Sequence, residues 1–133
     1  MQSRPRVLLV EDEPLIRLIL ADALDSAGHS IIESGTGEDA LTQLAITGFA
    51  AVVTDIRLGA GPSGWDVARA ARQQHPHIAV VYMTGDSAAD WASEGVPTSI
   101  LVQKPFAMAQ MITAVSSLLI SAAAPLWGPA LGK

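Results

Sequence analysis

A carboxylate follows a short apolar run near the middle of the chain, and this position is typical of a reactive group. Asp55 comes directly after Val52-Val53-Thr54 and before the turn-rich stretch 59–64. A buried strand that stops at an acid places that acid at the carboxyl end of the strand. In open α/β sheets, ligands bind in the crevice beyond those ends. The alternative is that Asp55 only begins a turn, and the rest of the chain has to decide between the two.

Polar side chains follow three other apolar runs. Glu11 and Asp12 follow the first run, Thr84 follows the fourth and Lys104 follows the fifth. If these runs are parallel strands, their ends meet at one edge of the sheet. Three carboxylates there repel one another, so a compensating cation is expected. A site of oxygen ligands suits Mg²⁺, and a lysine and a hydroxyl suit the oxygens of a phosphoryl group.

The elements that must position these residues alternate between strands and helices. Apolar runs predict strands at residues 7–10, 30–33, 51–54, 78–83 and 100–102. Helical spacing and capping signals predict helices at 14–27, 36–47 and 65–74, a short one at Trp91, and a last one after Pro105. Thr36 and Asp39 resemble a capping box. This alternation implies βαβ units with right-handed crossovers and a parallel sheet.

Length and composition narrow the class of protein. The 133 residues suit one domain, and half of them are hydrophobic with few aromatics, which suits parallel strands covered on both faces. The formal charge of −5 argues against partners such as nucleic acid or an anionic membrane. The absence of cysteine excludes disulfides, thiolate catalysis and cysteine-based zinc sites.

The two ends of the chain predict its location and its domain limits. The first apolar run is too short for a signal peptide or a membrane span, so the cytoplasm is the expected compartment. Helix breakers recur in residues 122–133, which predicts an irregular tail after a domain of residues 1–121. His29, His75 and His77 have no second ligand at useful spacing, and we expect them on the surface.

Taken together, the strand-end residues resemble those of the receiver domain of bacterial two-component response regulators. The matching segments are VLLVEDEP with Glu11 and Asp12, VVTDIRL with Asp55, VYMTGD with Thr84, and VQKPF with Lys104. The resemblance covers about residues 6 to 120. It implies a flavodoxin-like (βα)5 fold, that is, a doubly wound parallel five-stranded sheet with strand order 2-1-3-4-5.

The resemblance also implies roles for these residues. Asp55 would accept a phosphoryl group from the phosphohistidine of a histidine kinase or a histidine phosphotransfer protein. Glu11, Asp12, Asp55 and the backbone carbonyl of Arg57 would hold Mg²⁺. Thr84 and Lys104 would bind the phosphoryl oxygens and change position, which biases a two-state domain.

The expected protein is therefore a single-domain phosphoacceptor and no enzyme beyond its own self-phosphorylation and autodephosphorylation. It would signal by contact with an unknown downstream protein, without nucleic acid or membrane, and a homodimer is left open.

Some positions depart from the family pattern. Leu101 stands where many members carry Tyr or Phe as a rotating switch. The interval from Thr84 to Lys104 is short, so we expect an abbreviated fourth helix. The resemblance implies that Arg57 and Asp86, each two positions after a site residue, flank the path of the hydrolytic water, and we expect them to pair and to slow autodephosphorylation.

Two other functions compete with this interpretation. A phosphatase of the haloacid dehalogenase type also uses an Asp nucleophile, Mg²⁺, a Thr or Ser and a Lys. That family carries a second Asp two residues after the nucleophile, where this chain has Arg57. The second alternative is a degenerate receiver that only binds a partner, and retention of the residues for phosphoryl chemistry argues against it. Taken by themselves, Glu11 and Asp12 also suit an ordinary acid pair at a helix start.

Overall fold

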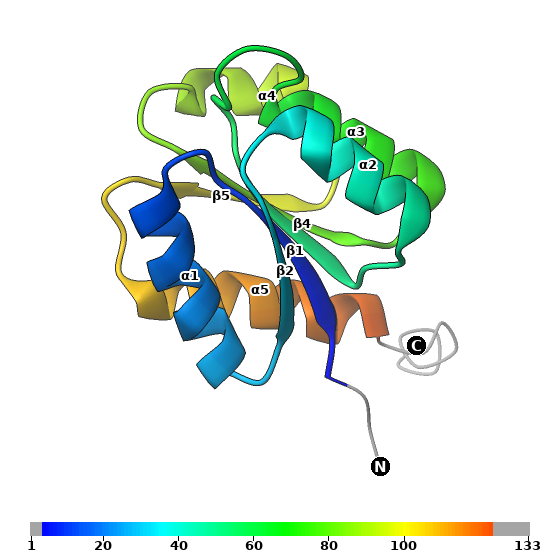
Figure 1. Ribbon diagram of the computed structural model, residues 1–133, viewed down its shortest axis with the longest axis vertical. Coiled ribbons are helices and arrows are strands. Elements are labelled where there is room, and N and C mark those ends of the chain that lie inside the picture. The colour runs from blue at the N-terminus through cyan, green and yellow to red at the C-terminus, as the bar shows by residue number, and fades with distance from the viewer. Residues whose placement is uncertain (1–3, 124–133) are drawn as a thin grey trace, which may run out of the picture.

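Five parallel strands form one sheet in the order β2-β1-β3-β4-β5, as predicted (Figure 1). The structure is a computed structural model and describes residues 4–123. The strands are β1 (Arg6–Val10), β2 (Ser30–Ser34), β3 (Ala51–Asp55), β4 (Ala79–Thr84) and β5 (Ser99–Gln103). Each lies within a residue or two of its predicted position. The flavodoxin-like fold class is confirmed.

Strands β3 and β4 are buried at every residue, which explains why their sequences read as unbroken apolar runs. Parallel strands have this composition when helices cover both faces of the sheet. In the register of the sheet, Val10 lies opposite Thr54 and Asp55 lies opposite Met83. The carboxyl ends of β1, β3 and β4 are therefore level with one another.

Helices cover both faces of the sheet (Figure 1). They are α1 (Pro14–Ser26), α2 (Gly37–Ile46), α3 (Gly64–Gln74), α4 (Trp91–Glu94) and α5 (Met108–Ala123). Helices α1 and α5 pack on one face through residues such as Leu20, Leu24, Met111 and Val115. Helices α2 and α3 pack on the other face through residues such as Ala40, Leu44, Val67 and Ala71. Each face thus has its own apolar core.

The end of α1 corrects the prediction that His29 lies on the surface. Gly28 adopts φ +104° and donates to the Asp25 carbonyl, while His29 N–H donates to the Leu24 carbonyl. This is a Schellman motif, in which the residue after the glycine usually packs back on the helix. His29 is accordingly buried, and burial, with the charge of Arg4, lowers its pKa.

The capping box forms at a different helix from the predicted one. Thr36 does accept from the Asp39 N–H, but the Asp39 carboxylate accepts from the hydroxyl of Ser34 instead of completing the box. The reciprocal pair of bonds occurs at the start of α3, between Ser63 and Asp66. Ser34 competes for Asp39 because β2 ends beside the start of α2.

The region after β4 is abbreviated, as predicted. A short 3-10 turn (Ala88–Asp90) leads into α4, which has only four residues. Leu101 on β5 lies opposite Tyr82 on β4, and the ring of Tyr82 packs against Trp65 at 4.7 Å between centroids. The Tyr82 hydroxyl accepts from the N–H of Val96. An aromatic ring therefore lies beside Leu101, but in the core on the neighbouring strand.

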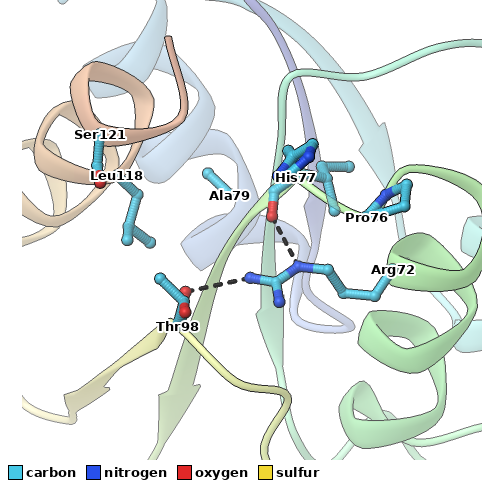
Figure 2. Close-up of a pocket in the computed structure, with 8 residues that line it drawn as sticks. Arg72, Pro76, His77, Ala79, Thr98, Leu118 and Ser121 are labelled. Atoms are coloured by element: carbon cyan, nitrogen blue, oxygen red, sulfur yellow. Dashed lines mark hydrogen bonds between the residues drawn. The ribbon is translucent and has the colours of Figure 1, made fainter. Parts of the chain in front are cut away.

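A hollow of about 170 Å³ lies at the amino ends of β4 and β5, at the edge opposite Asp55 (Figure 2). Arg72 crosses it and donates from Nε to the Ile78 carbonyl (2.9 Å) and from Nη2 to the Thr98 carbonyl (3.1 Å). It also donates to the Pro97 carbonyl. One guanidinium thus ties α3 to the segments that enter β4 and β5.

The last helix continues past the predicted domain limit. Helix α5 runs to Ala123, so residues 122 and 123 are helical where an irregular tail was predicted. The rest of that predicted tail, residues 124–133, lies outside the described residues. Among residues 4–123, no helix combines the length and the apolar character that crossing a membrane requires.

Candidate functional site

The carboxyl edge of the sheet brings the predicted acids together. Glu11, Asp12 and Asp55 each place a carboxylate oxygen within 4.8 Å of the other two. Lys104, which follows β5, places its ammonium 3.2 Å from Glu11 Oε1 and 2.9 Å from Asp55 Oδ2. These four residues come from three segments that are far apart in the sequence, and the parallel sheet makes them neighbours.

Glu11 is buried and held through all of its polar groups. Its N–H donates to the Ser34 carbonyl, and its carboxylate accepts from Glu13 N–H at 3.1 Å and from Lys104. Its backbone carbonyl accepts from Arg17 Nη1 at 2.7 Å. Burial raises the pKa of Glu11, and the negative charge of Asp55 adds to the rise, while Glu13 N–H and Lys104 offset part of it. The loop after β1 therefore holds a carboxyl group that is costly to ionise.

Asp55 ends β3, and the loop that follows it returns close to the end of the strand. The backbone of Gly64 passes so near that a Cβ there would lie 2.1 Å from the Asp55 carbonyl oxygen. Gly64 N–H also donates to the Ile56 carbonyl at 2.8 Å. Only glycine fits this contact, which closes the loop against the end of β3.

Lys104 is the one cation that pairs with the carboxylates of these acids within the described part of the chain. Burial alone would lower its pKa, but the hydrogen bonds and charges of Asp55 and Glu11 outweigh this effect and raise it. Asp12 is exposed and forms no ion pair with another residue of the 4–123 range. One ammonium for three carboxylates leaves an acidic excess, and oxygen ligands of this kind suit Mg²⁺.

Thr84 is buried at the end of β4 and its hydroxyl oxygen accepts two hydrogen bonds. The N–H of Asp86 donates to Oγ1 at 3.2 Å and the N–H of Ser87 donates at 2.7 Å. A hydroxyl has two acceptor lone pairs and one proton. With both lone pairs engaged, Thr84 can act towards a ligand only as a donor.

Arg57 and Asp86 form the pair that the sequence predicts. Arg57 Nε lies 3.0 Å from Asp86 Oδ1 and 2.9 Å from Oδ2, and both side chains are mostly exposed. The hydrogen bonds from Arg57 and from the Ser87 hydroxyl lower the pKa of Asp86. The pair joins the loops after β3 and β4 at the rim of the acidic site.

Three residues that contribute to the site are not predicted from the sequence, namely Arg17, Ser87 and Gly64. Ser87 had a usable signal, because a backbone N–H three residues after a Thr is a common partner for its hydroxyl. Arg17 had no such signal, because its contacts depend on how α1 docks against β2.

Two comparisons identify relatives of this arrangement. The family model described as "Response regulator receiver domain" matches residues 7–116. The response regulator protein FleR of Pseudomonas aeruginosa is 35% identical over 91 residues, which are 68% of this chain and 19% of FleR. The chain thus spans about a fifth of that relative, and the similarity concerns one module of it.

Solved structures share the fold. The response regulator receiver protein from Sinorhizobium medicae superposes with a TM-score of 0.88 and is 41% identical, with 90% of this chain and 98% of that one covered. The receiver domain of the sensor histidine kinase PA1611 from Pseudomonas aeruginosa has a TM-score of 0.75 at 20% identity, over 88% and 98% of the two chains. That structure has a magnesium ion coordinated in its active-site cleft.

Proposed function

Because the chain belongs to the response regulator receiver family, we propose that Asp55 accepts a phosphoryl group from a histidine kinase or a histidine phosphotransfer protein in a Mg²⁺-dependent reaction. The observation that carries this proposal is the meeting of three carboxylates and one ammonium at the strand ends. Among the described residues, Glu11, Asp12 and Asp55 are the one group of acids whose carboxylate oxygens lie close enough together to hold a metal ion.

In the proposed reaction, a carboxylate oxygen of Asp55 attacks the phosphorus atom of the donor phosphohistidine. A P–O bond forms, the P–N bond breaks, and the imidazole of the donor leaves and takes up a proton. Glu11, Asp12, Asp55 and the backbone carbonyl of Arg57 would hold Mg²⁺, which neutralises charge on the transferring group when bound. The magnesium ion in the cleft of the PA1611 receiver domain supports this assignment.

Lys104 and Thr84 would stabilise the phosphoryl oxygens. Lys104 already contacts Asp55, so its ammonium can follow the charge from the carboxylate to the phosphoryl group with a small movement. Thr84 has a proton to donate and no free lone pair, which suits an anionic acceptor. Both residues would change partners on phosphorylation and thereby bias the domain between two states.

The signal would leave the site without a rotating aromatic residue. Leu101 has no ring to turn, whereas Thr84 is bonded directly to the loop that leads into the short α4. We propose that this loop relays phosphorylation to a downstream protein. Amide exchange in the presence of a phosphoryl analogue should change within residues 84–104. Changes confined to the Asp55 loop would contradict the relay.

The partners, the location and the oligomeric state of the protein are predictions from the sequence. Contact with a protein partner, without nucleic acid or membrane, and a location in the cytoplasm are proposals, as is the absence of any catalysis beyond self-phosphorylation and autodephosphorylation. Formation of a homodimer is left open.

Labelling with a small phosphodonor tests the function directly. Incubation with acetyl phosphate and Mg²⁺ should add one phosphoryl group to the intact protein, and EDTA should prevent this. Asp55→Asn should abolish labelling, while Asp25→Asn, an equal change at an exposed acid paired with Arg4, should not. An unlabelled wild-type protein would favour the degenerate binding module, and release of free phosphate from added monoesters would favour the phosphatase.

A further inference from the structure

Arg17 on α1 joins three segments beside the acidic site. Its Nη1 donates to the backbone carbonyl of Glu11 at 2.7 Å, and its Nε lies 3.3 Å from Glu33 Oε1 on β2. The side chain of Arg17 is 22% exposed and that of Glu33 is 42% exposed, so the guanidinium is the more shielded partner of this pair. A guanidinium holds two acceptors in one plane, which a lysine ammonium does not do.

The residue after β2 has no side chain and leaves room for this guanidinium. Gly35 follows β2, and a Cβ at this position would come 3.0 Å from Arg17 Nη1. A side chain there would lie in tight contact with the guanidinium, which would have to shift slightly. The carboxylate of Glu33 holds the Nε side of the same guanidinium. The position of Arg17 is therefore built by β2 as well as by α1.

The carbonyl that Arg17 holds belongs to the peptide unit between Glu11 and Asp12. A peptide unit is planar, so the direction of the Glu11 carbonyl sets the direction of the Asp12 N–H and constrains the Asp12 backbone. Glu11 is held by other bonds as well, whereas Asp12 is exposed. Among the three acids, Asp12 is thus the one whose orientation depends most on Arg17.

We propose that Arg17, anchored by Glu33, is a positioning residue that orients Asp12 towards the metal site. This inference rests on the proposed function, in which Asp12 is a ligand of Mg²⁺. Arg17 touches neither the metal nor the phosphoryl group; it acts through the peptide plane. Groups that orient metal ligands typically change metal affinity by about 10- to 100-fold when they are removed.

The test compares four variants of the full chain. Arg17→Lys keeps the charge and loses the planar fork, Arg17→Met loses both, and Glu33→Gln removes the charge of the anchor. Arg69→Met is the matched control, because Arg69 also pairs with a glutamate, Glu94, away from the site. Mn²⁺ affinity is measured by water proton relaxation, the Asp12 amide by NMR in EDTA, and stability by thermal melting.

Both Arg17 variants should bind Mn²⁺ about tenfold more weakly than wild type, and Glu33→Gln should weaken binding in the same direction. In EDTA, the Asp12 amide resonance should move in the Arg17 variants and stay in place in Arg69→Met. Unchanged Mn²⁺ affinity or an unmoved Asp12 amide in Arg17→Lys would overturn the inference. So would shifts spread over the core with a fall in melting temperature, since these indicate a purely structural role.

The failure of the proposed function has a different signature. If wild-type protein binds no Mn²⁺ and takes no label from acetyl phosphate, the metal site itself is wrong. The chemical shift of the Asp12 amide in metal-free Arg17 variants still reports whether Arg17 orients the loop.

Discussion

Two cations at opposite edges of the sheet have opposite surroundings. Lys104 lies at the carboxyl ends of the strands and donates to two carboxylates. Arg72 lies at the amino ends and donates to backbone carbonyls (Figure 2). The acids around Lys104 raise its pKa, whereas burial among neutral groups lowers the pKa of Arg72.

The difference shows which of the two regions can do chemistry. The N–H donors of Arg72 are taken up by backbone carbonyls of Ile78, Pro97 and Thr98, so this guanidinium serves to tie segments together. Around Lys104, three acids share one ammonium and leave an acidic excess that a divalent cation can balance. Converging like charges, and not the hollow beside Arg72, mark the edge at which we propose the reaction.

The largest expected effect is on stability at the acidic edge. Lys104→Met should lower the free energy of unfolding in EDTA by about 3 kcal/mol, because it leaves the buried carboxylates of Glu11 and Asp55 without their cation. Urea unfolding at neutral pH measures this. Saturating Mg²⁺ should restore part of the loss. A loss as small as that of an exposed ion pair would mean that water already screens these acids.

At the opposite edge the expected loss is smaller and has no functional consequence. Arg72→Met should cost about 1–2 kcal/mol, since it removes hydrogen bonds to carbonyls that stay partly buried. Labelling of Asp55 by acetyl phosphate should be retained in the folded variant. Loss of labelling at a temperature where the variant is folded would contradict the prediction that the amino-terminal edge has no part in the reaction.

The pH dependence of stability should also differ between variants at the two edges of the sheet. The folded-state pKa of Glu11 is raised above its ordinary value of 4.5. The folded protein therefore holds this proton more tightly than the unfolded chain, and ionisation of Glu11 destabilises the fold as pH rises from about 4.5 through the raised pKa. In EDTA, Glu11→Gln should gain stability relative to wild type over that interval. Arg72→Met should show no such trend, and a constant difference for Glu11→Gln would refute the prediction.

Removal of the exposed acid should have a small effect of the opposite sign to that of Lys104. Asp12→Asn relieves repulsion without breaking an ion pair among the described residues, so it should stabilise the metal-free protein by less than about 1 kcal/mol. It should also abolish the rise in melting temperature on addition of Mg²⁺. Thermal melts with EDTA and with Mg²⁺ measure both effects. A lower melting temperature in EDTA would show that the acids are not crowded.

The smallest expected effect concerns the rim of the site. Arg57→Ala and Asp86→Ala should each shorten the half-life of the phosphorylated protein about two- to threefold, because an exposed pair restricts water access only modestly. The double variant should lose little more than either single one, since paired residues are not additive. Decay of the phosphorylated mass with time gives the half-lives. Longer half-lives in both single variants would contradict the proposed screening.

Much of the fold and the acidic site follows from local signals in the sequence. Unbroken apolar runs predict buried parallel strands, and helical spacing between them predicts the crossovers, so the α/β class follows from periodicity. Asp55, Thr84 and Lys104 each stand at the end of such a run. Because parallel strands end at one edge of a sheet, these runs predict that the three residues share that edge. The strand order that makes β3, β4 and β5 neighbours came from the resemblance to receiver domains.

The tertiary structure decided contacts that join distant segments. The ion pair of Arg17 with Glu33 requires α1 to dock beside β2, and the contact of Gly64 with Asp55 requires the loop to fold back on β3. The burial of His29 depends on the turn at Gly28, and Asp39 turns to Ser34 because β2 ends beside α2. Periodicity and caps report on residues within a turn or two of each other. These contacts depend on how whole elements pack, and only the folded chain specifies that.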